Sequence, residues 1–181
     1  MIIYHGSYTV VKYPNIILGK NTKDFGYGFY CTRIKEQAEK WVNKYKTPVI
    51  NSYELADISD LKVKVFKEYN EEWLDFIVHC RNGGEHEYDV VEGFMCDDTI
   101  WDNLEDYING YIDKASFLEM MKFKWSNNQI SFHTVKALKR IQFIGSKKIE
   151  KQNLWWNYKK TILDLRIASI VFLCLFIDNK V

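Results

Sequence analysis

The chain has 181 residues, of which 47% are hydrophobic and 16% aromatic, so we expect one core-forming domain and no disordered segment. Its 25 basic and 24 acidic residues are interleaved and leave a net charge of +1, which argues against a dedicated nucleic-acid-binding protein. The four cysteines are far apart and the four histidines form no cluster, so we expect reduced thiols and no metal site.

The first half of the chain alternates short strands with two helices. A strand at 2–4 ends at His5-Gly6-Ser7, and an aromatic-rich strand follows the irregular stretch 8–27. The next helix ends before Pro48 and has one apolar face. That face consists of residues at helical spacing, namely Ile34, Ala38, Trp41, Val42 and Tyr45. Besides the strand at 2–4, the expected strands of this half are 28–32, 49–55 and 61–66, and its expected helices are 33–46 and 71–80.

The second half follows a turn at Asn82-Gly83-Gly84 and shows the same mixture. A helix capped by Asp97 or Asp98 is expected to end at Gly110. The remaining expected elements are strands at 88–94, 129–132 and 141–144 and helices at 114–123 and 134–139. Because the elements do not alternate as regular βαβ units, and no GxGxxG loop is present, the predicted class is α+β without a Rossmann fingerprint.

The chain changes character near Lys147, where a basic stretch with Trp155-Trp156 begins. The uncharged apolar run 167–177 that follows is well short of the roughly 20 residues that a membrane-spanning helix needs, so we expect no span. We divide the chain into a domain at 1–145 and a C-terminal helical, apolar tail at 146–181, which either covers the core or binds an interface or partner. Met1-Ile2-Ile3-Tyr4 lacks the basic region of a signal peptide, so we expect a cytoplasmic protein.

Two short motifs carry the functional signal, Tyr4-His5-Gly6-Ser7 and Gly28-Phe29-Tyr30-Cys31-Thr32. They resemble the two opening signatures of the His-Tyr-Glu branch of the ADP-ribosyltransferase superfamily, which contains diphtheria toxin and the poly(ADP-ribose) polymerases. The resemblance implies a split β-sheet core with flanking helices and NAD as the co-substrate. In that branch an aromatic residue eleven positions after the strand tyrosine closes the nicotinamide pocket, and here that position is Trp41.

A second resemblance extends over roughly residues 1–145. The run Asp24-Phe25-Gly26-Tyr27-Gly28-Phe29-Tyr30, with Tyr88 to Gly93 and Cys96-Asp97-Asp98, looks like an uncharacterised bacterial family within the same superfamily.

The resemblance implies a role for each motif residue. Tyr30 and Trp41 would sandwich the cationic nicotinamide ring, and the backbone of Gly6 would pair with its carboxamide. His5 would donate a hydrogen bond to a ribose hydroxyl, and Ser7 would add a second polar contact. The implied cofactor-binding set is Tyr4, His5, Gly6, Ser7, Phe29, Tyr30, Thr32 and Trp41. The plainer interpretations are a structural hydrogen bond for His5, an ordinary strand aromatic for Tyr30 and core packing for Trp41.

The third element of the branch, a glutamate that begins a late strand, is replaced by Gln129. The implied catalytic residues are therefore His5, Tyr30 and Gln129. An amide can hydrogen-bond the ribose but carries no charge to offset an oxocarbenium-like transition state. Three outcomes stay open: a single transfer to a reactive acceptor, a substitute carboxylate such as Glu92 or Asp97, or NAD binding without turnover.

The leading hypothesis is an NAD-dependent mono-ADP-ribosyltransferase that acts on an unknown protein or nucleic-acid acceptor. Such a small domain suits a bacterial toxin or a toxin–antitoxin component, which makes an antitoxin a candidate partner. One alternative is a catalytically silent module that binds NAD or ADP-ribose. Another is an enzyme that removes a 2′-phosphate from RNA, which would need a basic surface that the interleaved charges do not provide.

Overall fold

The computed structural model describes residues 1–18, 23–96, 98–121 and 127–150. The chain divides into two compact units, 1–149 and 150–181. Of the helical tail predicted at 146–181, residues 146–148 belong instead to a strand, and residues 151–181 lie outside the described residues. Within the described part, no helix has both the length and the apolar character that a membrane crossing requires.

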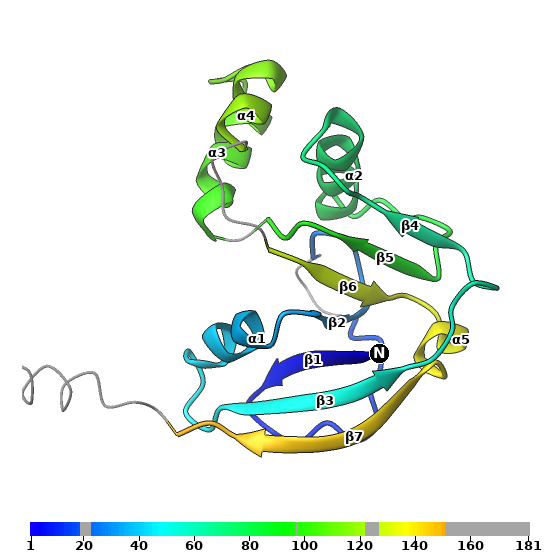
Figure 1. The fold of residues 1–181 in the computed structure, drawn as a ribbon. Coiled ribbons are helices and arrows are strands. Elements are labelled where there is room, and N and C mark those ends of the chain that lie inside the picture. Colours follow the sequence, from blue (N-terminus) through cyan, green and yellow to red (C-terminus); the bar gives the residue numbers. More distant parts are fainter. Residues whose placement is uncertain (19–22, 97, 122–126, 151–181) are drawn as a thin grey trace, which may run out of the picture. The chain divides into compact units, whose positions relative to one another are not determined.

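Over its described residues, the first unit contains two β-sheets and five helices, which confirms the predicted α+β class (Figure 1). One sheet has the strand order β1-β3-β7 and is antiparallel, whereas the other has the order β2-β6-β5-β4 with β4 and β5 parallel. The strands are β1 (Ile2–Ser7), β2 (Phe29–Cys31), β3 (Val49–Leu55), β4 (Val63–Val65), β5 (Val90–Gly93), β6 (Gln129–Phe132) and β7 (Ile141–Lys148). The helices are α1 (Lys35–Val42), α2 (Glu71–Arg81), α3 (Asp98–Ile108), α4 (Lys114–Met121) and α5 (Val135–Leu138).

Local sequence explains where several helices begin and end. The side chain of Asn70 caps α2 by accepting a hydrogen bond from the backbone N–H of Trp73 at 2.9 Å. Thr134 caps α5 in the same way, through Ala137. Gly110 follows α3 with a φ of 75°, a left-handed conformation that glycine adopts without strain. These capping residues act over a few positions, so the sequence alone predicts the helix ends that they mark.

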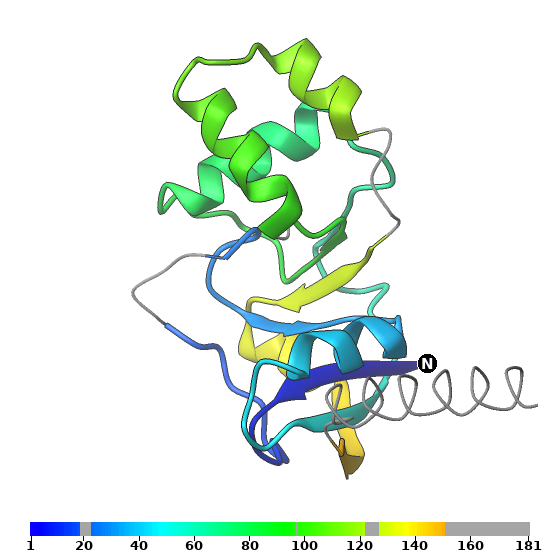
Figure 2. The same cartoon turned by 90° about the vertical axis from the view of Figure 1, so that its left-hand side faces the viewer.

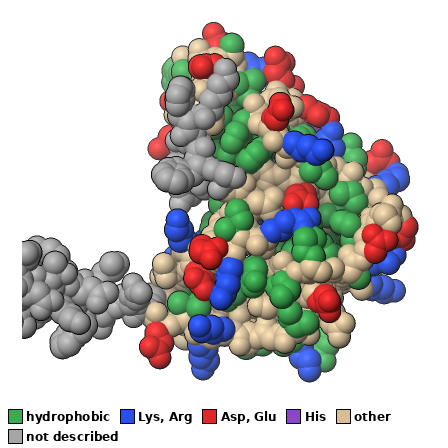
Figure 3. All heavy atoms as spheres, viewed as in Figure 1, with side chains coloured by type: hydrophobic (Ala, Val, Ile, Leu, Met, Phe, Trp, Pro, Cys, Tyr) green, Lys and Arg blue, Asp and Glu red, His purple; other side chains and the backbone are tan. Residues whose placement is uncertain are grey.

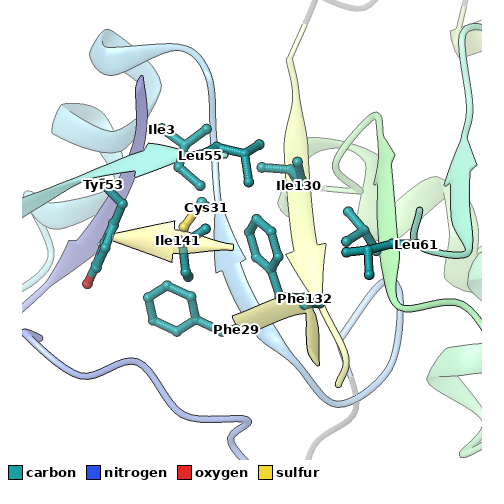
Figure 4. Packing of buried hydrophobic residues seen from close by; sticks show 11 residues of the cluster. Ile3, Phe29, Cys31, Tyr53, Leu55, Leu61, Ile130, Phe132 and Ile141 are labelled. Carbon is teal, nitrogen blue, oxygen red and sulfur yellow. The ribbon is translucent and has the colours of Figure 1, made fainter. Parts of the chain in front are cut away.

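The two sheets pack face to face around one hydrophobic core (Figure 4). Ile3 and Tyr53 contribute to it from the first sheet, and Phe29, Ile130 and Phe132 from the second. All five side chains are at most 1% exposed. Burial of this apolar surface is the main force that holds the sheets together.

A second core lies on the opposite face of the four-stranded sheet, under α2, α3 and α4 (Figures 1 and 2). Its largest member, Trp73 of α2, is fully buried and packs with Phe117 of α4. A third and smaller cluster joins α1 to the first sheet through Ala38, Val42 and Ile50. The four-stranded sheet is therefore covered on both faces, and β2 at its edge lies beside β1.

Candidate functional site

The two sequence motifs lie side by side in the structure. Tyr4 and Thr32 exchange two backbone hydrogen bonds, each 2.8 Å long, and the His5 Nδ1 lies 2.7 Å from the Tyr30 carbonyl oxygen. These contacts join the edge of one sheet to the edge of the other. We call the paired segments Tyr4–Ser7 and Phe29–Thr32 the motif seam.

The motif seam determines which ring nitrogen of His5 carries the proton. A carbonyl oxygen only accepts hydrogen bonds, so Nδ1 of His5 is the protonated nitrogen that donates to Tyr30. Burial lowers the pKa of His5 below its ordinary value, which keeps the ring neutral at neutral pH. The Nε2 atom is then an acceptor. His5 would therefore accept a hydrogen bond from a ligand hydroxyl, which reverses the donor role expected from the sequence.

Gly6 lies directly against the C-terminal turn of α1. A Cβ atom at this position would lie 2.6 Å from Cγ1 of Val42 and 3.2 Å from Cδ1 of Trp41. Any side chain here would push the helix end away, so the close approach requires glycine. The same contact places the Trp41 ring beside the motif seam.

The exposure of Trp41 differs from the expectation that it joins the apolar face of its helix. The side chain is 43% exposed, so the core-packing interpretation is wrong. The reason is that α1 covers only Lys35–Val42, and its buried stripe consists of Ala38 and Val42. Lys44 places its Nζ 3.3 Å from the centre of the Trp41 ring. Trp41 is thus an exposed aromatic surface next to Gly6.

Tyr30 is held by the loop that precedes it. Its hydroxyl donates to the Gly26 carbonyl at 2.7 Å and accepts from the Phe25 N–H at 3.1 Å. Burial, together with the negative charge of Asp24, raises the pKa of Tyr30 far above its ordinary value, so the hydroxyl stays protonated. The ring packs against the second core, on the face of β2 opposite to Phe29.

The other predicted cofactor-binding side chains support the seam. Phe29 is 1% exposed and its ring lies 4.5 Å from that of His5, so it braces the imidazole from the core and presents no surface to a ligand. Thr32 Oγ1 accepts from the Ile34 N–H, and Ser7 Oγ accepts from the Thr9 N–H. Tyr4 is half-buried against α1.

Gln129 begins β6 as predicted, but its amide is engaged inside the protein. Nε2 donates to Asp24 Oδ2 at 2.8 Å and to the Phe94 carbonyl at 3.2 Å. Both partners are acceptors, and Gln129 is only 6% exposed. A glutamate in the same place would face a carboxylate and a carbonyl without a proton to share. This arrangement gives a structural reason for an amide at the position.

The two carboxylates considered as substitutes for a glutamate are not both described. Asp97 lies outside the described residues. Glu92 pairs with Arg33 through two contacts of 2.5 and 2.6 Å and also accepts from Asn128 Nδ2 at 3.2 Å. A bidentate arginine pair holds Glu92 in place and neutralises its charge. No group of three or more potential metal ligands occurs among the described residues.

Two hollows on the described surface lie away from most of the predicted site. The larger, of about 680 Å³, is lined by Tyr13, Leu138 and Phe143 among others, and the smaller, of about 370 Å³, includes Tyr4 and Ile50. Neither is lined by His5, Tyr30 or Trp41. On the face shown in Figure 3, charged side chains of both signs are interspersed, in keeping with the interleaved sequence.

Comparison with known proteins places the chain in a family. The model of a family described as "Protein of unknown function (DUF3990)" matches residues 1–143. The chain belongs to the DUF3990 family. No curated protein and no solved structure matches it.

Sequence reasoning missed the residue that organises the interior of the DUF3990 fold next to Gln129. Asp24 is 5% exposed and accepts four hydrogen bonds: two from the Arg81 guanidinium, one from the Cys96 N–H at 2.8 Å and one from Gln129. We call Asp24, Arg81, Cys96 and Gln129 the Asp24 cluster. Its members are far apart in the chain. The only local signal was that Asp24 opens the aromatic run that ends at Tyr30.

Two histidines that sequence reasoning did not single out hold the loop that precedes β2. His86 Nε2 donates to the Phe25 carbonyl at 3.0 Å, and His133 Nδ1 donates to the Tyr27 carbonyl at 2.7 Å. With the Tyr30 hydroxyl on Gly26, three successive carbonyls each receive a side-chain donor. Burial, with a contribution from the nearby His86, lowers the pKa of His133 to about 4. The loop before β2 is therefore pinned at every residue from Phe25 to Tyr27.

Proposed function

We propose that this domain is an NAD-dependent mono-ADP-ribosyltransferase that binds NAD at the motif seam. The observation that carries the proposal is the bond between His5 Nδ1 and the Tyr30 carbonyl, which joins the two motifs and leaves Nε2 as an acceptor. A ribose hydroxyl is a suitable donor for that atom. The two packed sheets, with helices on their outer faces, are what a split-sheet core of the ADP-ribosyltransferase type would require.

The surroundings of Gly6 support a place for the nicotinamide ring. The C-terminal turn of α1 packs against Gly6, which brings the exposed Trp41 ring immediately beside the Gly6 backbone. Nicotinamide is a flat cation in NAD, and an indole face attracts such a ring by stacking and by its quadrupole. Backbone pairing with the carboxamide and stacking on Trp41 are therefore compatible roles for adjacent residues.

The reaction that we propose breaks the bond between nicotinamide nitrogen and ribose carbon. The electron pair leaves with nicotinamide, which becomes neutral, and the ribose acquires oxocarbenium character. The acceptor nucleophile then forms the new bond to that carbon and releases its proton to solvent. Glu92 and Asp24 are already paired with Arg33 and Arg81, so we expect one transfer per acceptor and no chain elongation.

The setting of this activity is also a proposal. The acceptor would be a protein or a nucleic acid, in a bacterial toxin or a toxin–antitoxin component, with an antitoxin as a further partner. We place it in the cytoplasm, where NAD is available. Cys31 and Cys80 are buried free thiols, as such a compartment favours.

The test is release of nicotinamide from NAD in the presence of cell extract, with mass spectrometry to find added ADP-ribose. We expect His5→Ala to reduce release by roughly tenfold or more, because loss of one directed hydrogen bond costs about 1.5 kcal/mol. His79→Ala is the matched control, since His79 is exposed and bonds only the Glu85 carbonyl among described residues. Undetectable NAD binding at millimolar ligand would refute the proposal.

A second candidate function is a catalytically silent module that binds NAD or ADP-ribose. The observation that favours it is the engagement of Gln129 Nε2 by Asp24 and the Phe94 carbonyl, which leaves the late-strand position without an amide donor for the ribose. The two functions differ in turnover. Binding of NAD without nicotinamide release, with cell extract present, would select the silent module.

A further inference from the structure

An ammonium group occupies the aromatic surface that the proposed function assigns to nicotinamide. Lys44 Nζ lies 3.3 Å from the centre of the Trp41 ring and 5.5 Å from the centre of the Tyr45 ring. A cation this close to an indole face is attracted by the ring quadrupole. The Cδ1 edge of the same ring is the part that lies beside Gly6. Trp41 thus contacts both Gly6 of the motif seam and Lys44.

The backbone that carries Lys44 is anchored on both sides. The Tyr45 N–H bonds the Val42 carbonyl at 2.9 Å, which continues the last turn of α1. The Tyr45 ring packs edge-on against Tyr8 with a centroid distance of 5.9 Å, and Thr47 Oγ1 donates to the Tyr8 carbonyl at 2.6 Å. Tyr8 directly follows the first motif. The lysine is therefore held near Trp41 by contacts on each side of it along the chain.

We propose that Lys44 is a specificity-determining residue that disfavours a cationic ring on Trp41. This inference rests on the proposed NAD-binding function. The nicotinamide of NAD is positively charged, so it must either displace the ammonium from the indole or stack within the field of a like charge. The dihydronicotinamide of NADH is neutral, and ADP-ribose has no such ring. Lys44 weakens the binding of the first ligand and leaves the other two nearly unchanged.

The experiment measures calorimetric dissociation constants of the full chain for NAD, NADH and ADP-ribose, before and after Lys44→Met. Methionine keeps an unbranched stem and removes only the charge. We expect the affinity for NAD to rise roughly two- to fivefold, which corresponds to the strength of an exposed cation–π contact. We expect the affinity for ADP-ribose to stay within error. Lys44→Arg keeps the cation and should restore the wild-type preference.

Lys40→Met provides the matched control. Lys40 is exposed on α1, the helix that carries Trp41, so its substitution removes the same charge without a described contact to the Trp41 ring. If Lys44→Met and Lys40→Met change NAD affinity equally, or if Lys44→Met shifts all three ligands together, the effect is general electrostatics and the inference is overturned. Weaker NAD binding in Lys44→Met would also overturn it. If no ligand binds the wild-type chain, the proposed function itself fails and takes the inference with it.

Discussion

The motif seam and the Asp24 cluster both contain residues that the sequence assigns to catalysis, but they are built in opposite ways. At the seam, His5 uses Nδ1 for a backbone carbonyl, and Trp41 remains 43% exposed beside a glycine. In the cluster, Gln129 gives its amide to two internal acceptors, and Asp24 accepts four hydrogen bonds at 5% exposure.

The contrast separates binding from catalysis. A ligand needs directed polar atoms and surface that the protein has not already satisfied, and the seam offers both. The Asp24 cluster has internal partners for its polar atoms, so it joins α2, β6 and the segment that follows β5. Substitutions at the seam should therefore change ligand affinity more than stability, and substitutions in the cluster should do the reverse.

The largest effect is expected from Asp24→Ala. Removal of the carboxylate leaves the Arg81 guanidinium without its buried counter-charge and takes the acceptor from Gln129 and Cys96. Breaking a buried ion pair in this way typically lowers the free energy of unfolding by about 3–5 kcal/mol. Chemical denaturation measures this change in the free energy of unfolding. Asp57→Ala is the control, because Asp57 is exposed and its hydrogen bonds to Ser59 are local. Equal losses in the two variants would contradict the structural role of the cluster.

The next largest loss of stability is expected from Gln129→Glu. The new carboxylate would face Asp24 and the Phe94 carbonyl, so we expect a loss of roughly 1–3 kcal/mol in unfolding free energy and no gain in nicotinamide release. Gln142→Glu makes the same chemical change at an exposed position of β7, opposite Glu54 of β3, and should cost less than about 1 kcal/mol. A stable Gln129→Glu variant with faster release would instead place position 129 at the catalytic centre.

Acid sensitivity tests the loop that both regions share. The pKa of His133 is lowered to about 4 in the folded state, whereas an unfolded histidine titrates near its ordinary 6.5. Between these values the unfolded chain binds more protons, so stability falls as pH drops from 6.5 towards 4, by at most about 1.4 kcal/mol per pH unit for this group. His133→Gln should flatten the pH dependence of denaturation across that window. An unchanged slope would mean that His133 is not the group responsible.

The smallest effect on stability is expected from Trp41→Ala. An exposed aromatic contributes little to the core, so we expect a change within about 0.5 kcal/mol, whereas NAD affinity should fall roughly three- to tenfold as the stacking surface is lost. Trp73→Ala is the contrasting variant, since a fully buried tryptophan typically costs about 3–5 kcal/mol. The comparison of the two regions fails if Trp41→Ala destabilises the protein as much as Trp73→Ala does.

Sequence patterns predicted elements best where short-range chemistry decides them. The bounds of β3 (Val49–Leu55) and β6 (Gln129–Phe132) agree with expectation, and α2 is one residue longer than predicted. The helix expected at 33–46 was too long. Apolar spacing continues to Tyr45, but that side chain packs on Tyr8 and its segment has left the helix. A tertiary contact outweighed local periodicity there, which also explains the exposure of Trp41.

The candidate site divides in the same manner. The two motifs could be predicted from the sequence, because they consist of glycine, histidine and aromatic residues at fixed spacing along the chain. The partners of Gln129 could not, since Asp24 lies 105 residues away and no local pattern connects them. The protonated nitrogen of His5 also required the structure, because the Tyr30 carbonyl that determines it comes from another strand.

By itself, then, the sequence determined the α+β class, most element positions and the motif pair, which depend on interactions between near neighbours. The tertiary structure alone decided that Trp41 is exposed under Lys44, that Glu92 and Asp24 are paired with arginines, and that Gln129 faces inward. These outcomes depend on contacts between distant segments. Hydrogen bonding and charge pairing in the folded interior select them, and residue order along the chain does not reveal them.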